Sequence, residues 1–205
     1  MHRGGAFEEC HRIERGVVRL VAVKTGEVGG IGHGRAPFGR QITPAGQGGT
    51  GVAPVPRAAA QAAHASRCPA EYGLDARFEA LVGTVASAFL AAHDPAREAC
   101  WIAERDGVNL GSVFLVRAGD ELARLRLLLV EPAARGEGLG RRLVETCLDF
   151  ARAAGYRRIT LWTNDVLTAA RHIYHAAGFR LVASKPHADF GPAMLGEDWE
   201  RDLGQ

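Results

Sequence analysis

The sequence predicts a layered α/β domain over residues 67–205, with a mixed, mostly antiparallel sheet flanked by helices. From about residue 70, the spacing of apolar residues switches repeatedly between the helical and the strand period. Asp106-Gly107 is a strong hairpin turn between two strand patterns. Two amphipathic helical patterns end at Gly155 and Gly178, and each is followed by a strand pattern. This order is typical of one domain that is long enough to bury a core.

The first helix is predicted around Phe78–Phe89, where apolar residues recur at i, i+3, i+4, i+7 and i+11. Asp75 is its expected N-cap, and Pro95 ends the segment. The other expected elements are strands Ala99–Arg105, Val108–Arg117 and Glu121–Val130, helix Leu139–Ala154, strand Arg158–Thr163, a helix from Val166 to Ala177, and strands Phe179–Ser184 and Met194–Leu203.

Two details of the early strands are also predicted. Gly111 interrupts a strand pattern and indicates a bulge. Leu125, Leu127 and Leu129 recur with period two, so we expect them on one face of their strand.

Residues 1–66 differ in composition from the rest of the chain and are predicted to be a mostly disordered leader. They hold 13 of the 26 glycines, and only Val17–Val23 has a strand pattern. The Arg/Gly/Ala character is that of a GC-rich bacterial genome, and a wrongly assigned start is a second interpretation. Gly46–Gly51 matches G-x-G-x-x-G, but no strand precedes it and no helix follows it, so a linker is preferred.

Charge and cysteine content exclude several classes of protein. Residues 1–66 carry 8 basic and 4 acidic side chains (+4), and residues 67–205 carry 17 and 19 (−2), which gives the total of +2 and no basic nucleic-acid-binding core. The four cysteines show no metal-site spacing, and we expect no metal. The cysteines therefore fit a reducing cytoplasm best, which is the expected compartment. No apolar run approaches the ~20 residues of a membrane helix, so no helix is expected to span a membrane.

The strongest functional pattern is the run from Leu127 to Leu143, in which a hydrophobic strand leads through a glycine-rich turn into a helix. The first turn of a helix presents unpaired N–H groups at the positive end of the helix dipole. Glycines let a pyrophosphate approach this backbone closely, and Arg135 can add a charged contact. The absence of Gly-Lys-Ser/Thr distinguishes the turn from a P-loop.

This run resembles the coenzyme A signature of the GNAT acetyltransferases, Arg/Gln-x-x-Gly-x-Gly/Ala after a strand ending in Val-Asp/Glu-Pro. Arg135, Gly138 and Gly140 match it, as does Val130-Glu131-Pro132, and the resemblance covers about residues 72–203. It implies a GNAT fold and acetyl-coenzyme A as co-substrate. It assigns coenzyme contacts to Leu128, Leu129, Val130, Arg135, Gly136, Glu137, Gly138, Leu139, Gly140, Arg141, Asn164 and Ala170.

A second motif, Ala170 to Phe179, resembles the family's Ala-x-x-x-Tyr-x-x-x-Gly-Phe. The resemblance implies that Tyr174 protonates the departing thiolate of the coenzyme. A phenol, with its usual pKa of ~10, is protonated at neutral pH and suits this role. The alternative is that Tyr174 is a packing residue on the apolar face of its helix.

Other site residues are less specific. Asn164 or Asp165 is the natural N-cap of the helix that follows, which is preferred over coenzyme binding for Asn164. Glu131 is the acid nearest the strand end and the candidate general base, with Glu121 and Glu104 as further candidates. His187 and Asp189 lie in a loop that, in this family, often lines the acceptor site.

Residues 124–203 resemble most closely the GNAT half of bacterial fusion proteins that also carry a MarR-type winged helix, although residues 1–66 do not resemble a winged helix. The predicted function is direct acetyl transfer from acetyl-coenzyme A to a primary amine, on a small molecule or a peptide, in a ternary complex. A non-catalytic acyl-coenzyme A-binding regulatory or interaction module is the alternative. A homodimer is one expected assembly.

Overall fold

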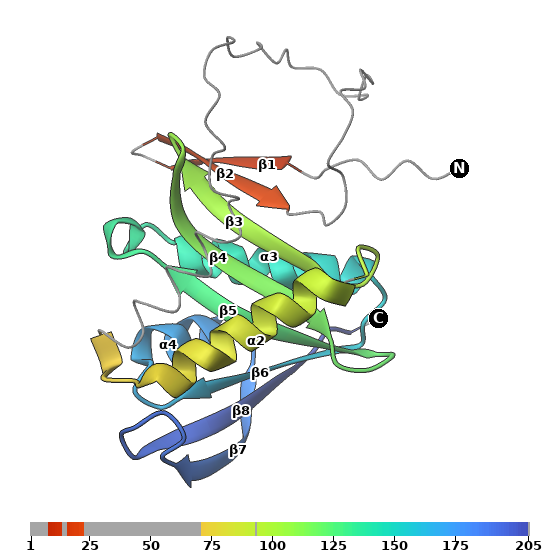
Figure 1. The fold of residues 1–205 in the computed structure, drawn as a ribbon. Coiled ribbons are helices and arrows are strands. Elements are labelled where there is room, and N and C mark those ends of the chain that lie inside the picture. Colours follow the sequence, from red (N-terminus) through yellow and green to blue (C-terminus); the bar gives the residue numbers. More distant parts are fainter. Residues whose placement is uncertain (1–7, 14–15, 23–70, 93, 205) are drawn as a thin grey trace, which may run out of the picture.

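The computed structural model of the protein describes residues 8–13, 16–22, 71–92 and 94–204. An eight-stranded sheet runs through the molecule, with α2 across one face and α3 and α4 on the other (Figure 1). The strands are β1 Glu8–Ile13, β2 Gly16–Ala22, β3 Ala99–Arg105, β4 Val108–Arg117, β5 Leu122–Val130, β6 Arg158–Asn164, β7 Arg180–His187 and β8 Met194–Asp202. The helices are α2 Ala76–Ala92, the short 3-10 turn η1 Pro132–Ala134, α3 Leu139–Ala153 and α4 Thr168–Ala176.

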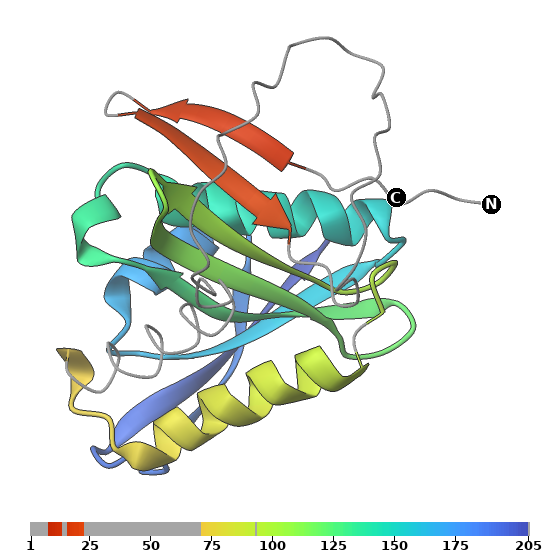
Figure 2. The same cartoon turned by 45° about the horizontal axis from the view of Figure 1, so that its top comes forward.

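The strand order is β1-β2-β3-β4-β5-β6-β8-β7. Neighbouring strands are antiparallel except β5 and β6, which are parallel because the crossover through α3 returns the chain to the same edge. Figure 2 shows the two layers of helices with the sheet between them. The predicted α/β class and the mixed, mostly antiparallel sheet are therefore confirmed.

From Ala76 onward, every predicted helix and strand is present, with ends that differ by a few residues. The hairpin turn at Asp106-Gly107 is confirmed: both residues have positive φ, 52° and 78°. Asp75 caps α2 as expected, since its Oδ1 accepts a hydrogen bond of 2.9 Å from the backbone N–H of Arg77. The fourth helix begins at Thr168 rather than Val166.

The N-terminal stretch that was expected to lie outside the domain contributes two strands. β2 corresponds to the strand expected at Val17–Val23, whereas β1 was not predicted. β1 pairs with β2 along its whole length, and β2 pairs with β3 from Arg19↔Glu104 to Ala22↔Trp101. Backbone pairing with a neighbouring strand explains an element whose own residues alternate poorly between apolar and polar. Residues 23–70 lie outside the described ranges.

The main hydrophobic core lies between the sheet and the α3–α4 layer. Leu139, Leu143 and Cys147 of α3 pack there with side chains of β3 to β6 and with Tyr174 and Phe179. Two smaller clusters lie under α2, one around Phe89 and Phe114 and the other around Leu74, Phe78, Val82 and Met194. The two faces of the sheet are therefore both covered, which explains the nearly continuous buried run in β4.

The pairing of β4 with its neighbours is interrupted twice. In the β3–β4 pair the register shifts beside the predicted bulge, with Ala103↔Gly111 followed by Glu104↔Asn109. In the β4–β5 pair, Leu127 and Leu128 lie opposite the single residue Val113, between Ser112↔Leu129 and Phe114↔Arg126.

This second bulge corrects one prediction. Leu125 and Leu129 face the main core, but Leu127 packs against the clusters under α2. Leu127 has a φ of 51°, a left-handed conformation that reverses the alternation of side chains along β5. A bulge formed by two residues within a run of three leucines leaves no turn residue in the sequence to reveal it.

Replacing Gly111 by alanine is expected to destabilise the protein. An added Cβ would lie 2.6 Å from the backbone oxygen of Leu129, so β4 and β5 would have to separate. We expect a loss of about 2 kcal/mol in the free energy of unfolding, measured by urea denaturation. The control is Gly119→Ala, whose Cβ would make an ordinary contact of 3.6 Å and should change stability by less than about 0.5 kcal/mol. Equal losses in both variants would contradict the close approach of the strands.

Candidate functional site

The candidate site begins where the parallel ladder between β5 and β6 stops. The register runs only from Leu122↔Arg158 to Arg124↔Thr160, although β5 continues to Val130 and β6 to Asn164. The bulge at Leu127-Leu128 lies shortly after this point, within β5. Beyond Arg124, the backbone of β5 on the β6 side is therefore outside the sheet ladder, and its N–H and C=O groups can pair with a ligand. This stretch includes the predicted contact residues Leu128, Leu129 and Val130.

The glycine-rich turn connects β5 to α3. The chain leaves β5 through η1, and Gly136 and Gly138 then adopt positive φ, 79° and 76°, conformations that favour glycine. Gly138 is the N-cap of α3, and no side chain hydrogen-bonds to that cap. Among the described residues, apart from the adjacent ones in the chain, no atom lies within 4 Å of the position that a Cβ would take on either glycine. The N-terminus of α3 thus has an open approach and the positive end of a helix dipole, which suits a pyrophosphate.

Gly140 brings three elements of the site together. A Cβ at this position would lie 2.7 Å from Cδ1 of Ile173 in α4 and 3.4 Å from Cγ2 of Val130 in β5. The first turn of α3, the end of β5 and the middle of α4 are thus in direct contact. Because Tyr174 follows Ile173, the two motifs that were recognised separately in the sequence lie side by side.

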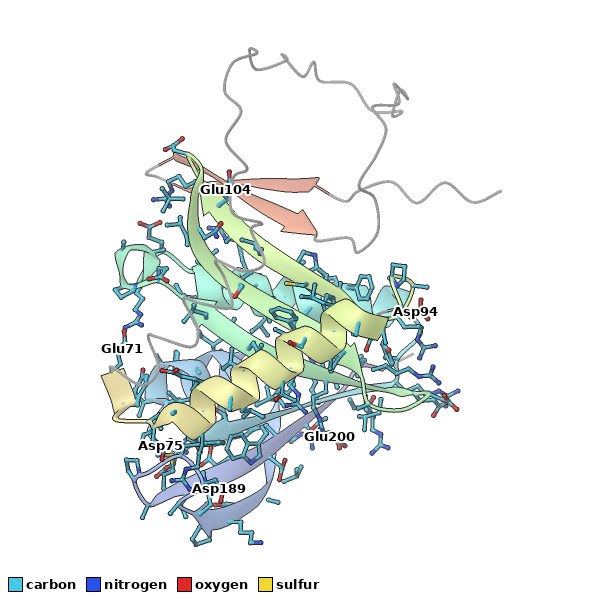
Figure 3. All side chains as sticks on the ribbon, viewed as in Figure 1. Glu71, Asp75, Asp94, Glu104, Asp189 and Glu200 are labelled. Carbon is cyan, nitrogen blue, oxygen red and sulfur yellow. The ribbon has the colours of Figure 1, made fainter. Side chains whose placement is uncertain are left out.

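The charged residues of the turn have partners within the protein. Nη2 of Arg135 lies 2.8 Å from Oε1 of Glu71, and its Nε donates to the backbone oxygen of Val130 at 3.3 Å. Figure 3 shows Glu71 beside this turn, just before α2. Nη2 of Arg105, in β3, lies 2.5 Å from Oε2 of Glu137, and both side chains are largely buried. Arg141 forms a long, exposed contact of 3.7 Å with Glu145.

The other predicted residues of the turn contribute through their backbone or their packing. Leu139 is buried in the main core, so only its N–H group can face a ligand. Ala170, on α4, packs against the same core.

Tyr174 is buried in the main core, where its ring packs against Phe179 with ring centroids 5.9 Å apart. Burial, and secondarily the neighbouring Cys147 thiol, raises the pKa of Tyr174 well above its ordinary value. The phenol is therefore protonated throughout the neutral range. Burial likewise raises the pKa of the Cys147 thiol, so this cysteine is a poor nucleophile.

The predicted capping role of Asn164 and Asp165 is wrong. The N-cap of α4 is Leu167, without a side-chain hydrogen bond. Oδ1 of Asn164 lies 2.8 Å from Nε2 of His187, and Oδ1 of Asp165 accepts a hydrogen bond from the backbone N–H of Leu195. These side chains connect the end of β6 to β7 and β8, because α4 starts later than its apolar pattern suggests.

His187 has a defined hydrogen-bonding state. The backbone N–H of Asp189 donates to its Nδ1 at 3.3 Å, so Nδ1 is the acceptor and Nε2 is the donor to Asn164. Asp189 itself is mostly exposed. The predicted acceptor loop is thus connected to the end of β6, and the N–H of Asp75 binds the oxygen of Phe190, which joins the loop to the start of α2.

An aromatic cluster lies at this corner, under the start of α2. The ring of Phe190 contacts those of Phe78, His187 and Trp162, with centroids 5.5 to 6.0 Å apart. Trp162 remains 40% exposed and packs over Gly196, where a Cβ would lie 2.7 Å from the indole ring. The cluster provides an aromatic surface, made of rings in edge-to-face contact, near the end of the β5–β6 ladder.

The candidate general bases lie in different places. Glu131 precedes η1 at the end of β5, and its side chain does not cap η1. Glu104 lies near the end of β3. Glu121 lies directly before β5, and its Oε1 is 3.1 Å from Nε of Arg157.

Several residues of the site were missed by the sequence analysis. Glu71, Arg105 and Trp162 are examples, and a fourth is Glu197, a buried carboxylate bound at 2.9 Å by Nε of Arg171 and by the indole N–H of Trp199. Glu197 fixes α4 to β8 and so holds the helix that carries Tyr174. A glutamate in an alternating strand pattern has no local signal that distinguishes a buried partner from an exposed one.

Within the described ranges, no His, Cys, Asp and Glu side chains gather in a group of three or more that could hold a metal ion. In the same part of the chain, no helix has the length and apolar character needed to cross a bilayer.

Solved structures share this fold. An acetyltransferase from Streptococcus agalactiae superposes with a TM-score of 0.54 at 21% identity, over 71% of this chain and 89% of its own. The structure of yncA, a putative acetyltransferase from Salmonella typhimurium with its cofactor acetyl-CoA, superposes with a TM-score of 0.50 at 21% identity, over 62% and 75%. At this identity the likeness shows the fold.

The relatives that are similar in sequence match a shorter part of this chain than the solved structures do. A mycothiol acetyltransferase of Beutenbergia cavernae is 37% identical over 86 residues, 42% of this chain and 28% of the relative. Human N-acetyltransferase 8B is 34% identical over 85 residues, 39% and 37% of the two chains. The chain thus spans well under half of the length of these curated relatives. A model of the Acetyltransferase (GNAT) family matches residues 62–179, more than half of the 205 residues. With the fold and both motifs in place, the chain belongs to the GNAT acetyltransferase family.

Proposed function

We propose that this protein transfers an acetyl group from acetyl-coenzyme A to a primary amine by direct attack in a ternary complex. The observation that carries the proposal is the convergence at Gly140, which joins the open N-terminus of α3, the end of β5 and the helix that carries Tyr174. An anion site, an unladdered strand edge and a neutral acid are the three parts that such a reaction needs.

The residues fit the coenzyme in the following way. The N–H groups of the turn from Arg135 to Arg141, opened by Gly136 and Gly138, would hold the pyrophosphate. The backbone of Leu128–Val130, outside the β5–β6 ladder, would pair with the amides of the pantetheine arm. Glu137, held by Arg105, and Ala170 would shape the two sides of this channel. Asn164 contributes through its bond to His187 rather than through a helix cap.

Bound acetyl-coenzyme A supplies the activated acetyl thioester, and the protein positions the amine and moves protons. Tyr174 would donate its hydroxyl proton to the sulfur that leaves as the amide bond forms, a role supported by its protonated state. Glu131 is the proposed acceptor of the amine's proton, directly or through water. Glu131→Gln, assayed by thiol release from acetyl-coenzyme A, tests this role. A covalent acetyl-cysteine route is disfavoured because Cys147 is fully buried with a raised pKa.

The wider setting of the protein is also a proposal. We infer a cytoplasmic enzyme that acts on a small-molecule or peptide amine, without a nucleic-acid partner, as a monomer or homodimer. Residues 161–167 and 196–203 lie within the stretch 124–203 that resembles the GNAT half of bacterial MarR-type fusion proteins, and this resemblance supports a relationship to them. The domain of this activity is proposed to be residues 67–205, with β1 and β2 extending its sheet.

Gly138→Ala should weaken coenzyme binding through a local change in the turn. Both Gly138 and Gly155 have left-handed φ, 76° and 78°, with open space around an added Cβ, and they lie at opposite ends of α3. Alanine at either position should cost about 1–2 kcal/mol of stability. Calorimetry with acetyl-coenzyme A should show an affinity loss of roughly tenfold for Gly138→Ala and little change for Gly155→Ala. The same affinity in both variants would count against pyrophosphate binding at this turn.

Tyr174→Phe tests the proposed proton donor. Removing a general acid typically lowers turnover by about a hundredfold or more, whereas removing one hydroxyl from the core changes packing little. We expect kcat for thiol release to fall with no change in acetyl-coenzyme A affinity. Unchanged kcat across pH 7–9 would make Tyr174 a packing residue. Binding without thiol release by the native protein for any amine would favour the acyl-coenzyme A-binding module instead.

A further inference from the structure

Two half-buried arginines, Arg124 and Arg126, lie on the α2-facing side of β5 next to the candidate site. Arg126 pairs in register with Phe114, whose ring packs against Phe89 of α2 at 5.2 Å, which fixes the face on which Arg126 lies. Arg124 is two residues earlier on the same face. Within the described ranges, no hydrogen bond or ion pair is recorded for either guanidinium group, whereas nearby Arg158 binds Glu200 at 3.4 Å.

Arg126 lies just beyond the point at which β5 stops pairing with β6. Arg124 is the last residue of β5 in the parallel ladder, paired with Thr160 of β6. Arg126 is two residues further on, on the same face and beyond the last paired residue, and Trp162 is likewise two residues beyond Thr160 on β6. Arg126 also directly precedes Leu127, where the left-handed kink begins. Arg126 is therefore on the α2-facing side of β5, just past the end of the ladder and directly before the part of β5 proposed to face the coenzyme.

Among the described residues, no carboxylate pairs with the positive charge of Arg126. Burial, and secondarily the neighbouring Arg124, lowers the pKa of Arg126 from its ordinary value. Glu200, the carboxylate on this face labelled in Figure 3, is already paired with Arg158. Asp198 lies opposite Trp162 but is exposed, on the far side of β6 from β5. Holding a desolvated cation beside another cation lowers stability unless an anion neutralises it.

We propose that Arg126 binds a carboxylate of the acceptor, so that the enzyme acetylates amines that carry a carboxylate, such as free amino acids or small peptides. A planar guanidinium matches a carboxylate with two parallel hydrogen bonds. The exposed face of Trp162 is available for the apolar side chain of such an acceptor. This inference rests on the proposed function, because it names the acceptor class of the same site.

The first test compares acceptors that differ only in the carboxylate. L-phenylalanine and L-leucine are each paired with their carboxamide, and thiol release from acetyl-coenzyme A is measured. At least one free amino acid should exceed its carboxamide in kcat/KM by about tenfold or more, as expected for a charged hydrogen-bonded pair. Equal values, or a preference for both carboxamides, would overturn the proposal.

The second test uses Arg126→Ala with Arg180→Ala as the matched control, since Arg180 lies at the outer strand of the same sheet, exposed and away from the kink. Arg126→Ala should raise KM for the free amino acid about tenfold and leave KM for the carboxamide unchanged. Arg180→Ala should change neither value. The melting temperature of Arg126→Ala is measured to detect a general folding defect, which would affect both acceptors alike. An equal effect on both acceptors in a variant whose melting temperature is unchanged would contradict the proposal.

Failure of the proposed function has a different signature. If no amine releases thiol, binding of L-phenylalanine and L-leucine to the protein saturated with coenzyme A is measured by calorimetry, with and without the Arg126→Ala change. Binding that needs Arg126 supports the carboxylate site even without turnover. No binding, or binding that survives Arg126→Ala, overturns it.

Discussion

The short parallel ladder between β5 and β6 is the constraint on which the rest of the site depends. Two neighbouring strands that paired along their full length would leave no backbone group for a ligand. Here pairing stops at Arg124↔Thr160, and the two-residue bulge at Leu127-Leu128 then redirects β5. The left-handed conformation of Leu127 is unfavourable for a leucine, and it persists because its side chain is packed under α2 and that of the next residue, Leu128, packs against the main core. The packing on both faces of the sheet thus maintains the opening.

The opening would be of little use without a rigid frame around it. Gly140 allows α3 to approach α4 and β5 more closely than any residue with a Cβ could. Glu197, bound by Arg171 and Trp199, fixes the other side of α4 to β8. A buried carboxylate of this kind adds little net stability, but it defines one arrangement of the helix because every alternative leaves the charge unpaired. Together these contacts hold the helix of Tyr174 against the start of α3, although the two motifs are far apart in the sequence.

The regular part of the fold and the coenzyme turn could be predicted from the sequence because their signals are local. Asp106-Gly107, Gly138 and the periodic face of α3 each specify a backbone conformation within a few residues. Leu127 could not be predicted, since leucine at a left-handed φ is imposed by tertiary packing. The cap predicted at Asn164 is wrong for a similar reason. The later start of α4 is set by contacts with β8, and the helical pattern of the sequence does not contain these contacts. Glu71, far from the turn in sequence, is a partner of Arg135 that only the fold reveals.

The pairing of Arg135 with Glu71 bears on how the turn can bind an anion. Both side chains are partly exposed, and ion pairs of this kind contribute at most about 1 kcal/mol. A pyrophosphate at the N-terminus of α3 would compete with Glu71 for the guanidinium at little cost, because the backbone N–H groups and the helix dipole provide interactions that Glu71 does not use. The buried Arg105–Glu137 pair differs, since opening it would leave two charges in a poorly solvated place. Arg135 is therefore the adjustable charge of the turn, whereas Glu137 is part of its fixed frame, and the signature arginine and the glycines act on the anion by separate means.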